Sequence, residues 1–246
     1  MVGYIARTPI SGSSVELTEQ GYHVHVESAD AVMDAMFRPE AENGSVFSVA
    51  DEPGRVINWF VASPKMNVDG ILTINKGTPM EKTYRLENAR GYHDHNWGFW
   101  LWQDDLGWDW GQASGKYTFG FGHITNNNHT ASKGAVLEVW KDKKKVAAFR
   151  DTEIKIRRDK MMNLPGMPDN PFPLVTVLNA SSGGNELNIE FDTERLTPIM
   201  IPFGGGYRVI WELSGTYKVS GYIGNKPVSY ETTGYLEYVA ELLITE

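Results

Sequence analysis

The sequence predicts an all-β protein built from antiparallel strands, for three reasons. Apolar and polar residues alternate over the segments 22–27, 56–61, 117–125, 135–140 and 187–191, as in strands that bury one face. The 25 glycines and 12 prolines supply turn residues at short intervals between such segments. Two long strands near the C-terminus flank a short turn. Together these patterns predict a sandwich or a barrel, and a barrel of about eight strands has room for one small ligand.

The C-terminal strands are expected over 207–222 and 228–243. A Gly-Asn-Lys-Pro sequence lies between them at 224–227, and glycine followed by asparagine favours the tight turn of a β-hairpin. The segment 161–173 holds four prolines and is expected to be a loop, because proline lacks the N–H that a sheet ladder uses. The segment 30–38 has some helical character but is too short and too mixed to assign.

Composition limits the classes of function. The chain has 246 residues, no cysteine and a formal net charge of −8 at pH 7. We expect no nucleic-acid partner, since binding to phosphate needs clustered lysine and arginine. The lack of cysteine excludes disulfides, thiolate metal sites and a cysteine nucleophile. No apolar run reaches the length of a membrane span and no secretory signal is visible, so a cytoplasmic protein is expected.

The segment 90–98, with the sequence RGYHDHNWG, is the densest group of functional side chains in the chain. It places an acid, two imidazoles, an amide and an indole within five consecutive positions. Four more tryptophans follow at positions 100, 102, 108 and 110. If buried, these polar groups need partners, because an unpaired one costs roughly 1–3 kcal/mol. Polar groups beside an aromatic wall are typical of a site for a hydrophobic substrate with a few reactive atoms.

The octapeptide at 91–98, followed by a Trp-x-Trp-Gly step at 108–111, resembles the carotenoid 1,2-hydratase (hydroxyneurosporene synthase) family. That family also contains kievitone-hydratase-like proteins and the fungal decalin-forming Diels–Alderases. The segments 63–72, 211–215 and 234–238 are similar to family strands on either side of the motif, so the resemblance covers most of the chain. It implies two lipocalin-like antiparallel β-barrel units packed side by side, with the motif near their junction and with no metal or cofactor.

On this resemblance we expect a short N-terminal lipocalin-like domain over residues 1–98 and a C-terminal lipocalin-like β-barrel domain over 99–246. Typical members carry more chain before the motif, whereas 90 residues precede Gly91 here. The first domain is therefore expected to be minimal, incomplete or completed by another copy. An exposed strand edge there invites pairing, so a homodimer is among the expected assemblies.

The candidate catalytic residues are Asp94, His93, His95 and Glu212. An apolar surround raises the pKa of a carboxyl group and keeps it protonated, as alkene protonation requires. The alternative is that Asp94 belongs to a polar network that locks two domains together. Glu212 stands in an otherwise apolar strand and is either a pocket acid or one half of an ion pair.

The histidine spacing has a second interpretation. Histidines two positions apart point the same way on a strand and can ligate a metal. His93 and His95 have this spacing. His23 and His25 repeat the spacing, and His123 is a further candidate. The resemblance implies no metal, and no carboxylate pattern completes such a site, so we expect none.

The candidate substrate-binding residues are aromatic or lie in the motif. Indole faces can line a pocket for a polyene and stabilise a carbocation, although each ring can equally belong to an aromatic core. Gly120 and Gly122 leave space on one face of a strand, where a ligand or another backbone approaches or where the strand bulges. The full set is Tyr92, Asn96, Trp97, Trp100, Trp102, Trp108, Trp110, Tyr117, Phe119, Phe121, Trp211 and Tyr235.

The sequence therefore predicts an enzyme that acts on a hydrophobic unsaturated small molecule, a terpenoid or a polyketide polyene, by hydration of a C=C bond or by cyclisation. For hydration, a neutral carboxylic acid, Asp94 with Glu212 in reserve, protonates the alkene, and a water held by His93 or His95 adds to the cation. For cyclisation, the cavity holds a near-attack conformer. Two alternatives stay open: a lipocalin-like carrier of a hydrophobic ligand, and a scaffold in which the motif only joins two domains.

Overall fold

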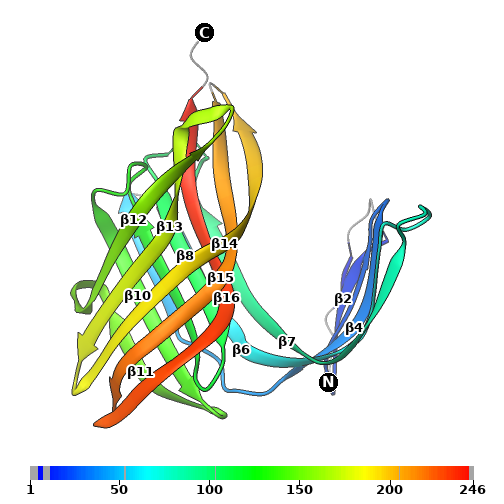
Figure 1. Ribbon diagram of the computed structural model, residues 1–246, viewed down its shortest axis with the longest axis horizontal. Helices are drawn as coiled ribbons and strands as arrows, with labels where there is room; N and C mark the ends of the chain where they lie inside the picture. Colours follow the sequence, from blue (N-terminus) through cyan, green and yellow to red (C-terminus); the bar gives the residue numbers. More distant parts are fainter. Residues whose placement is uncertain (1–4, 8–11, 53, 103, 205, 244–246) are drawn as a thin grey trace. The chain divides into compact units, whose positions relative to one another are not determined.

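The computed structural model describes residues 5–7, 12–52, 54–102, 104–204 and 206–243. These residues form two β-sheets, which confirms the all-β prediction (Figure 1). The one helical element among them is a single 3₁₀ turn, η1 (Asp151–Glu153). No helix in these ranges has the length and apolar character needed to cross a bilayer.

The first sheet has seven strands in the order β1-β2-β3-β4-β6-β5, and β7 also pairs with β6. The segment 30–38 lies almost wholly in β4, which pairs with β3 on one side and β6 on the other. Cross-strand hydrogen bonds therefore decide a conformation that local sequence left open. The strands are β1 (Ile5–Arg7), β2 (Ser14–Thr18), β3 (Gly21–Glu27), β4 (Ala31–Pro39), β5 (Val46–Glu52), β6 (Arg55–Ile74) and β7 (Lys82–Phe99).

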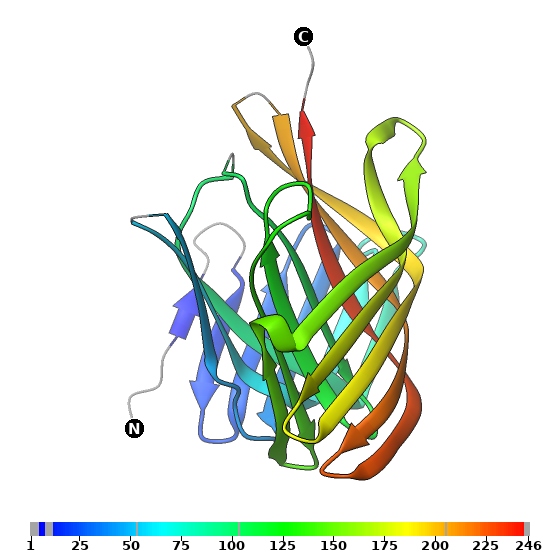
Figure 2. The ribbon, with the colours of Figure 1, turned by 90° about the vertical axis from the view of Figure 1, so that its left-hand side faces the viewer.

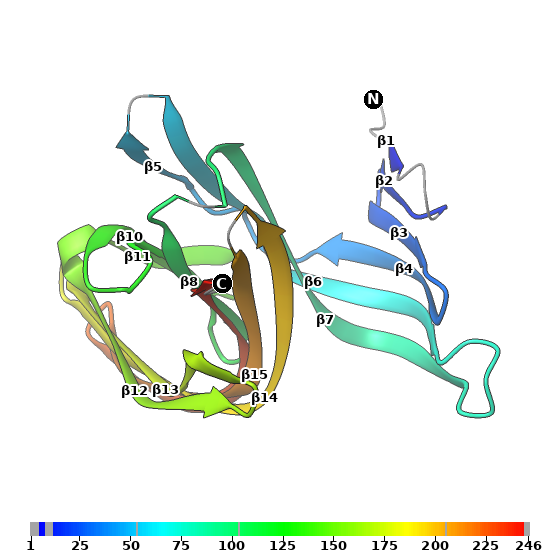
Figure 3. The same cartoon turned by 90° about the horizontal axis from the view of Figure 1, so that it is seen from above.

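The second sheet has nine antiparallel strands in the order β11-β10-β9-β8-β16-β15-β14-β13-β12. The strands curl around a common interior (Figures 2 and 3), as in a lipocalin-like barrel. They are β8 (Gly107–Ser114), β9 (Thr118–Thr125), β10 (Ser132–Lys141), β11 (Lys144–Arg150), β12 (Ile154–Leu164), β13 (Met167–Ser182), β14 (Asn185–Phe203), β15 (Gly206–Ile223) and β16 (Lys226–Leu243).

The predicted C-terminal hairpin is confirmed, but its turn is tighter than expected. Strands β15 and β16 pair from Gly206 opposite Leu243 to Ile223 opposite Lys226. The turn consists of Gly224 and Asn225 alone, both with positive φ (56° and 62°), which is the backbone of a type I′ turn. This two-residue turn fixes which residues of the two strands face each other.

The prediction of a loop over 161–173 is wrong. Strands β12 and β13 continue through this segment, with Met161 opposite Pro173 and Leu164 opposite Met167. The paired register of β13 with β14 begins at Val175. Three of the four prolines thus lie in a part of β13 that has one registered neighbour, where a missing N–H removes no ladder bond on the open side.

The residues group into two compact units: Met1–Asn43 with Ser63–His93, and Gly44–Ala62 with Asp94–Glu246. Strands β6 and β7 contribute to both units. The division at residues 98 and 99 and the homodimer stay predictions, and each unit is described by itself below.

The first unit is an open sheet with two different faces. The register places Tyr22, Ala35 and Phe37 on one face, with Phe37 opposite Val68. On the other face, His23 and His25 each make a 3.0 Å hydrogen bond to the carboxylate of Asp34. The His-x-His pair at 23 and 25 therefore binds a carboxylate, which lowers the pKa of Asp34 through these two hydrogen bonds.

The second unit has a dense aromatic core inside the nine-stranded sheet. A residue near the centre, Tyr217, packs edge-on against Phe119 at a centroid distance of 5.0 Å. Its burial raises the pKa of its hydroxyl well above the usual value. Large side chains that are at most 1% exposed fill this interior, among them Phe119, Phe121, Phe149, Phe172, Phe191, Trp211 and Tyr217.

The segment 44–62 of the second unit covers part of the outer face of the nine-stranded sheet. A methyl group placed on Gly122 would lie 3.5 Å from Cε3 of the Trp59 ring, so the missing side chain makes room for this indole. At the other end of the segment, the backbone N–H of Ser45 donates to Oε2 of Glu138 at 2.9 Å. The outer face beside Gly122 is therefore a buried layer in which polar side chains are partly shielded from water.

Candidate active site

Strand β8 presents opposite chemistry on its two faces. Its burial alternates strictly, with Gly107, Asp109 and the residues in step with them buried inside the barrel, and Trp108 and Trp110 half-buried on the outer face. This is the period-two pattern of a strand between two packed layers. The two indoles of the Trp-x-Trp-Gly step thus lie on the same outer face as Trp59.

Two glutamates face each other on that outer face, beside the tryptophans. Glu237 on β16 is directly opposite Glu212 on β15 and directly opposite Trp110 on β8. The carboxyl groups of the two glutamates lie within hydrogen-bonding reach of each other, and such a bond forms when one of them carries a proton. The indole Nε1–H of Trp108 donates to Oε1 of Glu237.

A third carboxyl group comes from the octapeptide. Asp94, near the C-terminal end of β7, is half-buried and accepts a 2.7 Å hydrogen bond from Nε1 of Trp59. Its negative charge acts on Glu237 together with that of Glu212. The second unit therefore brings three carboxyl groups and three tryptophans together, from strands β6, β7, β8, β15 and β16.

The surroundings raise the pKa of Glu237 from its usual 4.5 to about 8. Burial is the largest cause, because it disfavours the charged form. The hydrogen bond from Trp108 acts in the opposite direction, and the charges of Glu212 and Asp94 add to the effect of burial. With a pKa of about 8, Glu237 is mostly protonated at neutral pH and is a carboxylic acid able to donate a proton.

Two of the four catalytic residues predicted from the sequence lie together, and two lie elsewhere. Asp94 and Glu212 are beside Glu237, and the residue across from Glu212 on the neighbouring strand is this carboxyl group, not a cation. His95 is exposed and stacks on Trp97 with centroids 5.1 Å apart. His93 belongs to the first unit, is half-buried, and packs edge-on against Tyr22 at 4.8 Å.

The predicted substrate-binding residues fall into three groups. Trp108 and Trp110 flank the carboxyl groups, and the ring of Trp102 lies 6.2 Å from that of Trp108. By contrast, Tyr117, Phe119, Phe121 and Trp211 point into the barrel core, on the opposite side of the sheet from Glu237. These four rings therefore lie in the aromatic core of the second unit.

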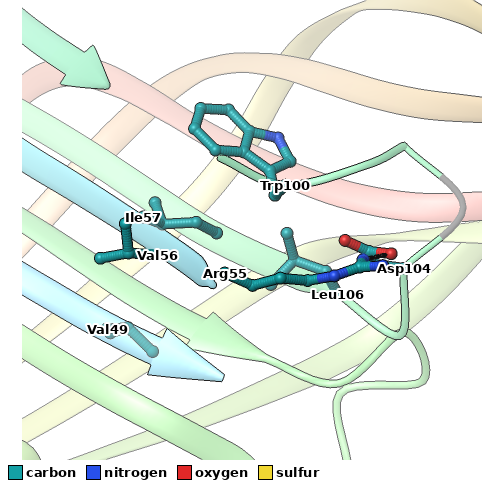
Figure 4. A pocket seen from close by; sticks show the side chains of 7 residues that line it. All are labelled: Val49, Arg55, Val56, Ile57, Trp100, Asp104 and Leu106. Atoms are coloured by element: carbon teal, nitrogen blue, oxygen red, sulfur yellow. Dashed lines mark ion pairs between the residues drawn. The ribbon is translucent and has the colours of Figure 1, made fainter. Parts of the chain in front are cut away.

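The remaining candidates lie nearer the surface. Tyr92 is half-buried and Asn96 is exposed, while Trp97 and Tyr235 are 38% and 54% exposed. Trp100 lines a surface hollow in which Arg55 forms an ion pair with Asp104 (Figure 4). The hollow is lined by Val49, Arg55, Val56, Ile57, Trp100, Asp104 and Leu106.

Glu237 was not among the predicted site residues, although the sequence held a signal for it. A two-residue turn at Gly224 and Asn225 places residue 212 opposite residue 237, whereas a four-residue turn over 224–227 places it opposite Val239. Because the expected turn was two residues too long, the expected register did not place the two glutamates opposite each other. Trp59 gave no comparable signal, because its contact with Asp94 depends on long-range packing.

Comparisons with known proteins support the fold. No family model and no curated protein matches the chain. The crystal structure of CghA matches 99% of this chain and 75% of its own, with a TM-score of 0.65 and 14% identity. Kievitone hydratase from Nectria haematococca matches 96% and 70%, with a TM-score of 0.61 and 14% identity.

An AttH-type protein from Nitrosomonas europaea matches 94% of this chain and 68% of its own, with a TM-score of 0.59 and 15% identity. At such low identities these likenesses show a shared fold, which is the lipocalin-like all-β fold that the sequence predicts. They carry no residue roles to this chain.

Proposed function

We propose that this protein is an enzyme that acts on a hydrophobic, unsaturated small molecule, with Glu237 as the proton donor, and that it belongs to the carotenoid 1,2-hydratase and Diels–Alderase-like family. The observation that supports this most strongly is the place of Glu237, which accepts a hydrogen bond from the Trp108 indole and lies opposite Trp110 and Glu212, where burial raises its pKa to about 8. A neutral acid beside aromatic rings is what protonation of a C=C bond requires.

Hydration fits these groups step by step. Glu237 transfers its proton to one alkene carbon and becomes a carboxylate, which leaves a carbocation on the neighbouring carbon. The faces of Trp108 and Trp110 and the charges of Asp94 and Glu212 stabilise that cation. Water adds to the cation, and its excess proton returns to the carboxyl groups, so that the acid is restored.

The fold likeness to kievitone hydratase, a hydratase by its name, supports this class of reaction. A cyclisation that needs a hydrogen-bond donor could use the same protonated Glu237 without transfer of the proton. Tyr235, Trp97 and Asn96 lie toward solvent, and we propose that they contact substrate at the rim of the site.

The test is a product analysis with wild-type protein and four variants. Purified protein is incubated with a panel of isoprenoid and polyketide polyenes in H₂¹⁸O, and products are analysed by mass spectrometry. Hydration adds one labelled water, cyclisation gives an isomer without label, and a carrier returns the ligand unchanged. Asp94→Asn and Glu212→Gln are expected to slow hydration less than Glu237→Gln, because neither group holds the transferable proton.

Glu237→Gln should lower the hydration rate by roughly 100-fold or more, the usual effect of losing a general acid. Glu231→Gln is the matched control, because Glu231 lies on the same strand and is exposed. Hydration at the wild-type rate by the Glu237→Gln variant would contradict the proposal. Unchanged ligand with every member of the panel would favour the carrier.

A further inference from the structure

The interior of the second unit holds a separate group of titratable side chains that the proposed function does not use. Asp109 on β8 is completely buried and lies directly opposite His123 on β9. Arg158 on β12 binds both oxygens of the Asp109 carboxylate, through Nε to Oδ1 at 2.8 Å and through an NH2 group to Oδ2. These side chains point away from Glu237, because residues 108 and 109 lie on opposite faces of β8.

Asp109 is ionised despite its burial. Burial alone would raise its pKa, but hydrogen bonds from Arg158 and His123 outweigh this effect and hold the pKa well below its usual range. An ionised carboxylate only accepts hydrogen bonds. Nδ1 of His123, 3.1 Å from Oδ2 of Asp109, must therefore carry the hydrogen of this contact.

The same reasoning fixes the other side of the imidazole. When Nδ1 of a neutral histidine carries the hydrogen, Nε2 is an acceptor. Nε2 of His123 is 3.1 Å from Oγ of Ser132, so the serine hydroxyl donates to it when the imidazole is neutral. Aspartate, histidine and serine are thus linked in the order and with the tautomer of a nucleophilic serine site.

Exposure along this row of three residues also suits a nucleophile. Asp109 is 0% exposed, His123 is 9% exposed, and Ser132 is exposed at the start of β10. Ser132 is paired with Thr125, and a bulge between residues 132 and 134 interrupts the register with β9. Bulges re-aim side chains at strand ends and are common beside active sites.

We propose that Ser132, His123 and Asp109 form a second catalytic site, which hydrolyses carboxylic esters at one end of the nine-stranded sheet. Ser132 Oγ attacks the ester carbonyl carbon while Nε2 of His123 takes the hydroxyl proton. The bond to the leaving oxygen breaks, and the alcohol departs with that proton. Water then cleaves the acyl–serine, which releases the carboxylic acid and restores the hydroxyl.

Arg158 limits which esters can react. One of its guanidinium nitrogens lies 3.4 Å from Nδ1 of His123, and this positive charge opposes formation of a second cation on the imidazole. Esters with good leaving groups need less help from a base, so the substrate class is activated esters. His129 fixes the loop before Ser132, because its Nε2 donates to the carbonyl oxygen of Val239 at 2.6 Å.

The experiment uses the full chain and two probes, p-nitrophenyl acetate and an alkyl fluorophosphonate. We expect stoichiometric labelling by the fluorophosphonate, mapped to Ser132 by peptide mass spectrometry. Ser132→Ala and His123→Gln should lose labelling and hydrolysis by about two orders of magnitude or more. Ser229→Ala, which alters an exposed strand serine, should keep both, and thermal melts check that each variant is folded.

A thiol version keeps the proposal testable if Ser132→Ala does not fold. The chain has no cysteine, so Ser132→Cys and Ser229→Cys each introduce one thiol. Iodoacetamide should alkylate the thiol at position 132 at least about tenfold faster at pH 7, because an adjacent histidine lowers the thiol pKa. Equal rates at the two positions, or labelling that survives Ser132→Ala, would overturn the proposal.

The two proposals fail independently. Glu237→Gln should leave ester hydrolysis intact, and Ser132→Ala should leave any reaction of polyenes intact, because the two sets of residues lie on opposite faces of the sheet.

Discussion

Replacing Arg158 with methionine should destabilise the protein strongly. The Arg158 side chain is 11% exposed and pairs with a carboxylate that is 0% exposed. Methionine fills a similar volume but leaves the charge of Asp109 buried without its strongest donor. Breaking a buried pair in this way costs about 3–5 kcal/mol. In a domain of about 150–250 residues, this lowers the melting temperature by roughly 6–20 °C.

A double-mutant cycle measures this effect. Urea unfolding of wild type, Arg158→Met, Asp109→Asn and the double variant gives the coupling free energy, and the double variant should recover most of the loss because no buried charge remains. In the wild-type protein, the folded pKa of Asp109 is below its unfolded value, so the contribution of Asp109 to stability is lost as the pH falls. In Arg158→Met burial dominates and the sign reverses, so lowering the pH from 7 towards 5 should restore stability relative to wild type. A loss below about 1 kcal/mol, or no rescue by Asp109→Asn, would refute the reasoning.

Three further predictions test the outer face. Between pH 4.5, the unfolded pKa of Glu237, and its folded pKa of about 8, folded Glu237 holds a proton that the unfolded chain has lost. The contribution of Glu237 to the free energy of unfolding should therefore fall by about 1.4 kcal/mol per pH unit as the pH rises. Glu237→Gln should remove this pH dependence from stabilities measured by urea unfolding. Trp59→Phe keeps the ring over Gly122 but removes the donor to Asp94, and should cost about 1–2 kcal/mol in the same assay. Glu138→Gln should lower stability most at neutral pH and less in acid, because hydrogen bonds from Arg150 and Ser45 outweigh burial and lower the pKa of Glu138. A loss of stability that is larger in acid than at neutral pH would contradict this prediction.

The sequence was most informative where structure is local. The alternation of residues 207–222 and the Gly-Asn turn predict the C-terminal hairpin, since both signals concern neighbours along the chain. The register depends on the exact length of the turn, because a change of two residues in the turn changes every cross-strand partner. With a four-residue turn Glu212 would lie opposite Val239, whereas with the observed two-residue turn it lies opposite Glu237.

Long-range packing explains what the sequence could not show. Gly120 and Gly122 predict an open space on β9, but nothing in the sequence indicates that the ring of Trp59 fills it. Likewise, the rows of aromatic residues in β8 and β9 look alike in sequence. The structure shows that Trp108 and Trp110 flank carboxyl groups, whereas Phe119 and Phe121 belong to the core, because the faces of each strand are set by the sheet around it.

The proton on Glu237 is the central claim, and its titration tests it most directly. Side-chain carboxyl resonances of ¹³C-glutamate-labelled protein are followed from pH 3 to 10 by NMR, and the Glu237 signal is assigned by its loss in Glu237→Gln. We predict a midpoint near 8, which should fall in Glu212→Gln because the charge of Glu212 raises it. A midpoint near 4.5 in the folded wild-type protein would contradict the account, because Glu237 would then be a carboxylate at neutral pH with no proton to donate.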